Sequence, residues 1–214
     1  NPNAPADSAY NGVFDATISS LVPNADPENP GDMGIFDGGL GNRQWVLIKF
    51  TDILASLPDT AETINFETAT AAVRFRIFDE SPDQANVFLA LTDFDDSTRF
   101  SSFAENGGEP QVGVDYEAGA IAQFAPQPAG FININIAGLF QRLLDDNMPA
   151  DYGDEIRLLI VAGSANKAAM RSSERLFADE RPELQINYTR RQQISSIGCY
   201  PDQLVNNSTG PAGE

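Results

Sequence analysis

The side chains that could do chemistry in this chain are almost all carboxylates. The sequence contains 31 aspartates and glutamates, no histidine and a single cysteine, Cys199. Transition-metal centres in proteins use histidine nitrogen and cysteine sulfur, and Ser-His-Asp and Cys-His catalysis both need a histidine base. The composition therefore almost excludes these sites, and one cysteine cannot close a disulfide within the chain. We expect Cys199 to be inert rather than paired with another subunit.

Carboxylates could instead hold calcium, which takes about six to eight oxygen ligands. The segment 22–42 is rich in proline, glycine, asparagine and aspartate, so we expect a long loop there. Its acidic side chains that could gather a calcium ion are Asp26, Glu28, Asp32 and Asp37. Their spacing does not match the EF-hand pattern. We favour a solvated acidic loop over a calcium site, and we expect no required cofactor.

Two carboxylates are also sufficient for glycoside hydrolysis, provided that one of them has a raised pKa. Asp93, Asp95 and Asp96 cluster after an expected strand. With 31 acidic residues in the chain, some such cluster is expected anywhere, so its presence does not favour catalysis. We interpret it as a solvated strand end and predict that the chain is not an enzyme. An acid-only glycoside hydrolase is a distant alternative.

The net charge of −18 limits the classes of ligand that we expect the protein to bind. Such a field repels nucleic acid and anionic lipid, so we expect neither as a ligand. No apolar run approaches the roughly 20 residues that span a bilayer as a helix. The chain begins at Asn1 rather than methionine, and its only lysines are Lys49 and Lys167. We expect a secreted protein, extracellular or at the cell surface, whose signal segment has been removed.

Exposed aromatic and planar polar side chains are the groups that bind sugars. Trp45 and Tyr152 are candidate aromatic platforms, and Arg74 and Arg76 share one face of an expected strand. These four residues are the glycan-binding candidates. Because Trp45 lies in an apolar strand, we favour packing in the core over a platform for this residue.

A cluster of alternating charge lies in the last long loop and consists of Arg171, Glu174, Arg175, Glu180 and Arg181. We interpret it as a network of structural ion pairs that fixes the loop, in preference to a ligand site.

Hydrophobic patterning predicts a chain made mostly of strands. Strict alternation of apolar and polar residues marks half-buried strands, as in the closing segment with Leu184, Ile186 and Tyr188. The expected strands are residues 12–21, 45–50, 71–79, 87–94, 118–124, 131–136, 156–163 and 184–189. Apolar residues at helical spacing predict one short amphipathic helix from Ala137 to Asn147. The fold class is therefore all-β: a single antiparallel β-sandwich with one short helix.

The order of segments resembles the DNRLRE-type family of secreted jelly-roll modules, which is grouped with carbohydrate-binding modules. The segments that carry the resemblance are Asp15-Ala-Thr-Ile18, Val46-Leu-Ile-Lys-Phe50 before the Leu57-Pro58 turn, Ala71-Ala-Val-Arg-Phe-Arg-Ile77, Ile134-Asn-Ile-Ala-Gly-Leu-Phe-Gln-Arg-Leu-Leu144, and Ser173-Glu174 with Arg181-Pro-Glu-Leu-Gln-Ile-Asn-Tyr188. The match covers roughly residues 12–189. The family usually has a tryptophan-rich middle, whereas Trp45 is the only tryptophan here. The resemblance implies a secreted, non-catalytic jelly-roll, and some members bind acidic or plant-type polysaccharides.

The ends of the chain suggest a role in assembly. Residues 1–11 read as an extended N-terminal arm, 12–189 as the sandwich domain and 190–214 as a C-terminal tail. Such an arm can add a strand to the sheet of a neighbouring subunit. Our first hypothesis is a structural subunit that self-assembles through its arms, as a homo-oligomer or polymer, into an extracellular filament or surface layer. The alternative is a carbohydrate-binding module that recognises an extracellular polysaccharide.

Three asparagines lie in acceptor triplets for N-linked glycans: Asn187, Asn206 and Asn207. Because Asn187 falls on the outward side of its expected strand, it is accessible for modification.

Overall fold

The chain is described by a computed structural model that covers residues 12–25, 31–57 and 64–190. Ten strands form one curled antiparallel sheet, which confirms the predicted all-β, sandwich-like fold. The strands are β1 (Val13–Ser19), β2 (Asp32–Asp37), β3 (Arg43–Phe50), β4 (Ile64–Asp79), β5 (Ala85–Leu89), β6 (Ala122–Phe124), β7 (Gly130–Asn135), β8 (Ile156–Ala162), β9 (Ala168–Arg171) and β10 (Glu183–Arg190). The helices are α1 (Phe100–Phe103) and α2 (Ala137–Leu144), with a 3-10 turn at Ala178–Glu180.

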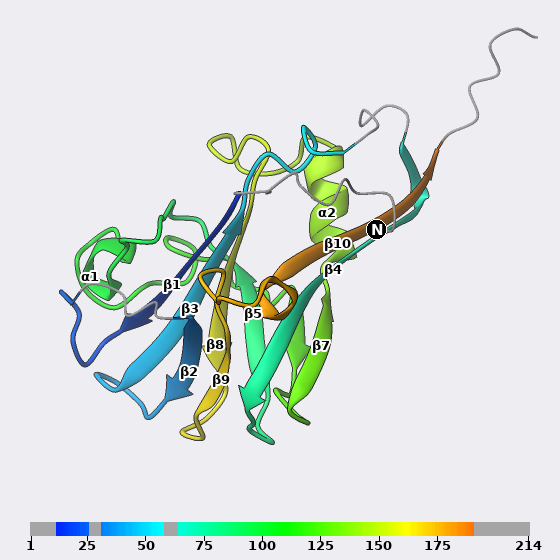
Figure 1. Cartoon of the computed structure of the whole chain (residues 1–214). Coiled ribbons are helices and arrows are strands. Elements are labelled where there is room, and N and C mark those ends of the chain that lie inside the picture. Colours follow the sequence, from blue (N-terminus) through cyan, green and yellow to red (C-terminus); the bar gives the residue numbers. More distant parts are fainter. Residues whose placement is uncertain (1–11, 26–30, 58–63, 191–214) are drawn as a thin grey trace, which may run out of the picture.

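The sheet curls into two halves that face each other across the core (Figure 1). Half A contains β1, β3, β8, β5 and β6, and half B contains β7, β4, β10, β9 and β2. Strand β2 joins them, because its first part pairs with β9 while Phe36 and Asp37 pair with β3. The helix α2 packs its apolar side, including Leu139 and Phe140, into this core.

Alternation along β4 separates the core from the outer surface of half B. Val73, Phe75 and Ile77 are buried between the halves, while Arg74 and Arg76 point away from them. Successive side chains of a strand point to opposite faces, so this sequence can bury one face only in this register. The direction predicted for both arginines is therefore confirmed.

A second apolar cluster covers the opposite surface of half A. The segment 90–121, which includes α1, lies against β1, β3 and β8 and buries Trp45, Leu47 and Leu159. Figure 1 shows α1 on the side of β1 that faces away from β4 and β7. Because half A is covered on both faces, β3 and β8 are apolar nearly throughout, as their sequences indicate.

The structure corrects several element predictions. The segment 22–42, expected as a loop, contains β2, whose Met33 and Ile35 lie in the core. Strand β9 and helix α1 were not predicted. The helix α2 ends at Leu144 rather than at residue 147, because Asp146 adopts a left-handed conformation (φ 52°) that terminates it.

No helix among the described residues is long and apolar enough to cross a membrane. Residues 1–11 and 191–214, which hold nearly all of both predicted arms, lie outside the described part of the chain.

Candidate binding face

The outer surface of half B presents a regular array of polar and aromatic side chains. Strand pairing aligns them in rows across β7, β4 and β10, with strands about 4.8 Å apart and alternate residues roughly 7 Å apart along each strand. We call this surface the outer face and define it by Ala72, Arg74, Arg76, Phe131, Asn133, Asn135, Glu183 and Gln185. Because three paired strands hold it, the array is rigid.

Phe131 is the aromatic centre of the outer face. Its side chain is 48% exposed, and it is paired with Arg76 across the β4–β7 ladder. The guanidinium carbon of Arg74 lies 4.6 Å from the ring centroid and that of Arg76 lies 5.2 Å from it. Cation–π contact of this kind fixes the ring and both guanidinium groups relative to one another.

The two arginines differ in their ion pairing. Arg74 Nη2 contacts a carboxylate oxygen of Glu183 at 2.6 Å, which neutralises its charge on the surface. Arg76 makes no ion pair with any residue in the described part of the chain. On a molecule of net charge −18, Arg76 therefore gives this face a local positive centre.

Amide side chains complete the outer face. Asn133 and Asn135 are exposed on β7, and Gln185 is half-buried on β10. Asn135 Oδ1 accepts a hydrogen bond of 2.9 Å from the Ala137 N–H, so its amide group is held in place with both N–H donors directed elsewhere. The face thus offers planar donors and acceptors around one aromatic ring.

Two of the four glycan-binding candidates are not available to a ligand. Trp45 is 3% exposed and packs against Phe100 and Tyr116, with ring centroids 5.6 Å and 6.2 Å away. Tyr152 is 1% exposed beneath the guanidinium of Arg157, and burial raises the pKa of its hydroxyl well above the ordinary value. Neither ring can stack on a sugar. Trp45 packs in the core, which is the interpretation favoured from its apolar strand, whereas the platform role considered for Tyr152 is wrong.

Arg74 and Arg76, in contrast, are brought together with Phe131, which the sequence analysis did not single out. The signal was present in the sequence, because Phe131 has the same parity along its strand as Asn133 and Asn135, both expected to point outward.

The calcium candidates are not gathered into one site by the described residues. Asp32 and Asp37 lie at opposite ends of β2, and Asp26 and Glu28 fall outside the described ranges. Arg171 Nη1 contacts Asp32 at 2.5 Å, and Arg43 Nε contacts Asp37 at 3.3 Å. Across the described ranges, no group of three or more acidic or cysteine side chains is arranged to hold a metal ion.

The aspartates that follow β5 are engaged in local interactions. Lys49 Nζ lies 2.9 Å and Arg157 Nε 3.3 Å from Asp93 Oδ1. Partial burial opposes ionisation of Asp93, but the hydrogen bond from Lys49 and the nearby positive charges outweigh it and hold its pKa below the ordinary value. Hydrogen bonds from Ser97 do the same for the pKa of Asp95. Neither carboxyl has the raised pKa that a glycosidase acid requires.

The charged cluster of the last loop forms a partial network. Glu180 accepts ion pairs from Arg175 at 3.0 Å and Arg171 at 3.4 Å, and Arg181 Nε donates to the Arg175 carbonyl at 2.7 Å. Glu174 accepts a hydrogen bond from the Ser173 hydroxyl instead. The arginines thus contact Glu180 and the loop backbone, and Glu174 is not one of their partners among the described residues.

Of the three glycosylation candidates, Asn187 lies exposed on β10, paired with Thr70 of β4. Asn206 and Asn207 lie outside the described residues.

Comparison with known proteins adds no relative. No model of a known protein family matches the chain, and no curated protein matches it.

Proposed function

We propose that this chain is a non-catalytic module that binds an extracellular polysaccharide through the outer face of half B. The observation that carries the proposal is the half-exposed ring of Phe131, which contacts two guanidinium groups on a surface of three paired strands. The resemblance to DNRLRE-type modules supports the same class of ligand.

The chemistry of the outer face suits a sugar chain. An aromatic ring packs on the apolar C–H face of a pyranose, while planar amide and guanidinium groups form paired hydrogen bonds with its hydroxyls. Because Asn135 and the two arginines already have side-chain partners, binding freezes little additional motion of these three side chains. Arg76, which makes no ion pair within the described ranges, also attracts acidic sugars, which the rest of this acidic molecule repels.

The hypothesis of assembly through the terminal arms stays a prediction. Residues 1–11 and all of the tail except Arg190 lie outside the described residues, so the structure has no bearing on them. Deletion of residues 1–11 tests it, since the hypothesis requires a folded protein that no longer assembles.

Replacement of Phe131 by alanine tests the proposed function. We expect about thirtyfold weaker binding in affinity gels that contain acidic or neutral plant-type polysaccharides, because truncating an aromatic anchor typically costs about 2 kcal/mol. The matched control is Phe177→Ala, which removes another exposed ring that is stacked with an arginine but lies outside the outer face.

If Phe131→Ala and the wild type migrate alike in every polysaccharide that retards the wild type, the outer face is not the binding surface. If no polysaccharide retards the wild type at all, the proposed function is wrong.

A further inference from the structure

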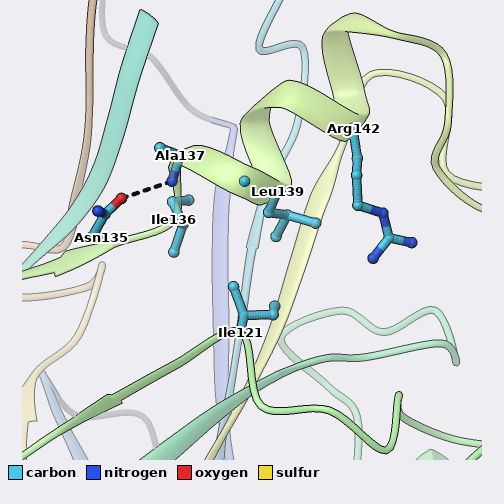
Figure 2. A pocket seen from close by; sticks show the side chains of 7 residues that line it. Ile121, Asn135, Ile136, Ala137, Leu139 and Arg142 are labelled. Carbon is cyan, nitrogen blue, oxygen red and sulfur yellow. Dashed lines mark hydrogen bonds between the residues drawn. The ribbon is translucent and has the colours of Figure 1, made fainter.

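A pocket of about 280 Å³ lies where β7 passes into α2 (Figure 2). Its apolar side is formed by Ile121, Ile136 and Leu139, and its polar side by Asn135 and Arg142. Figure 2 shows Ile121 facing Leu139 across the pocket, with Asn135 and Arg142 at opposite ends. Asn135 is also part of the outer face, so the pocket adjoins the surface proposed to bind a polysaccharide.

The polar groups at the pocket are hydrogen-bond donors. Asn135 uses its carbonyl oxygen to accept the Ala137 N–H, which leaves its amide N–H groups for a ligand. Arg142 donates from Nη1 and Nη2 to the two carboxylate oxygens of Glu117, at 3.0 Å and 2.9 Å. This pairing uses one N–H of each terminal nitrogen and leaves the other available.

The pocket carries no net charge, because Glu117 neutralises Arg142. A ligand group that fits must therefore be neutral, accept hydrogen bonds and present an apolar portion to the isoleucines and Leu139. The volume of about 280 Å³ lies just below the range of roughly 300–1,000 Å³ that is usual for small-molecule sites. It therefore admits a substituent and part of one sugar ring rather than a polymer chain.

We infer that this pocket binds an acetyl group carried by the polysaccharide. The acetyl carbonyl accepts a hydrogen bond from the Asn135 amide at one end of the pocket, and the methyl group packs against Ile121, while Arg142 at the other end donates to a hydroxyl of the sugar ring. A bare hydroxyl at the same position leaves the partly exposed Ile121 in contact with water and does not reach the Asn135 amide, so the acetylated chain binds more tightly. This inference rests on the proposed function, since the outer face holds the chain from which the substituent projects.

Matched ligands test the inference and distinguish the two sources of an acetyl group. For N-acetyl groups, chitohexaose is compared with cellohexaose, which has the same linkage and no acetamido group. For O-acetyl groups, an acetylated plant polysaccharide is compared with the same material after mild alkaline deacetylation. We expect at least tenfold tighter binding of the acetylated member of one pair, measured by isothermal titration calorimetry.

Gly138→Leu tests whether the preference arises in this pocket. Gly138 lines the pocket, and a Cβ atom at this position meets nothing within 4 Å, so the larger side chain enters the pocket without disturbing the core. We expect the preference to fall to less than twofold while binding of the deacetylated ligand is unchanged. Gly108→Leu is the control, because a Cβ there is equally unobstructed and Gly108 is not one of the residues that line the pocket.

Three outcomes overturn the inference. If both members of each ligand pair bind with equal affinity, the pocket does not recognise an acetyl group. The proposal that the outer face binds the polysaccharide is then unaffected. Retention of the preference by a folded Gly138→Leu protein places acetyl recognition elsewhere. A wild type that binds neither the acetylated nor the deacetylated ligands, and is retarded by no other polysaccharide, contradicts the proposed function itself.

Discussion

At the scale of single residues, the buried carboxyl of Asp15 is the clearest electrostatic feature. Its side chain is fully buried on β1, and its Oδ2 accepts a hydrogen bond of 2.6 Å from the Ser173 N–H. Burial raises the pKa of Asp15 from 3.8 to about 6, with repulsion from Glu174 and Asp96 adding to the effect and the hydrogen bonds from Ser173 opposing it. The folded state therefore binds this proton more tightly than the unfolded state does.

The sign of the resulting pH dependence follows from linkage. Ionisation of Asp15 costs folding free energy as pH rises from about 4 to about 6, and the cost persists above that range. Asp15→Asn removes the ionisation and keeps an oxygen that accepts the Ser173 N–H. We expect a gain of up to about 3 kcal/mol in the free energy of unfolding at pH 7.5 and little change at pH 4, measured by urea denaturation. Equal effects at the two pH values contradict this account of Asp15.

The sequence predicts which face of a strand a residue lies on, because side chains alternate along the strand. It does not predict whether that face is then buried by a segment from elsewhere in the chain. Arg74 and Arg76 were assigned correctly to an outward face because alternation alone determines it. Tyr152 was considered as a platform, but it is buried beneath Arg157, whereas the apolar strand around Trp45 already favoured the burial that the segment 90–121 provides. Contacts between segments so distant in the chain leave no periodic signal in the sequence.

At the scale of elements, the segment 90–121 acts as a second layer on half A, and Asp115 organises it. This carboxylate is 1% exposed and accepts hydrogen bonds from the N–H groups of Gln111 (2.7 Å) and Glu105 (2.8 Å) and from the Thr92 hydroxyl (3.1 Å). Its partners lie on both sides of α1, so one side chain ties together the two ends of the covering segment.

Asp115→Ala should loosen this layer. The change leaves buried N–H groups without an acceptor, and we expect a loss of about 3 kcal/mol in the free energy of unfolding. Because Trp45 is the only tryptophan and lies beneath the layer, its fluorescence should shift to longer wavelength in the folded variant. Asp95→Ala, in an exposed turn, is the control. An unchanged emission maximum together with unchanged stability contradicts the organising role of Asp115.

The elements themselves were predicted where the pattern is long and strong. Strands β3, β7 and β8 were expected at nearly their observed positions, because each combines apolar content with clear limits. Strand β2 was missed because it is short, includes Gly34 and lies among turn-forming residues. Its pairing with both β9 and β3 is a tertiary property, and this pairing is what joins the two halves.

At the scale of the whole molecule, the sandwich is strongly acidic, but the outer face of half B is not dominated by carboxylates. Half A is covered by a second layer, whereas the outer face of half B presents arginines, amides and Phe131 to solvent. The sequence predicted the sandwich and its acidic character, but the asymmetry between the two surfaces emerged only from the folded arrangement. A ligand that approaches this molecule therefore meets two chemically different sides.

The most direct test of the central claim is residue-resolved mapping of ligand contacts. An oligosaccharide from a retained polysaccharide is titrated into ¹⁵N-labelled protein, and amide and side-chain chemical shifts are followed by NMR. We predict that the largest shifts fall on Phe131, Asn133, Asn135, Arg74 and Arg76, with little change in the segment 90–115. Shifts concentrated on that segment or on the terminal arms, with the outer face unaffected, would contradict the account.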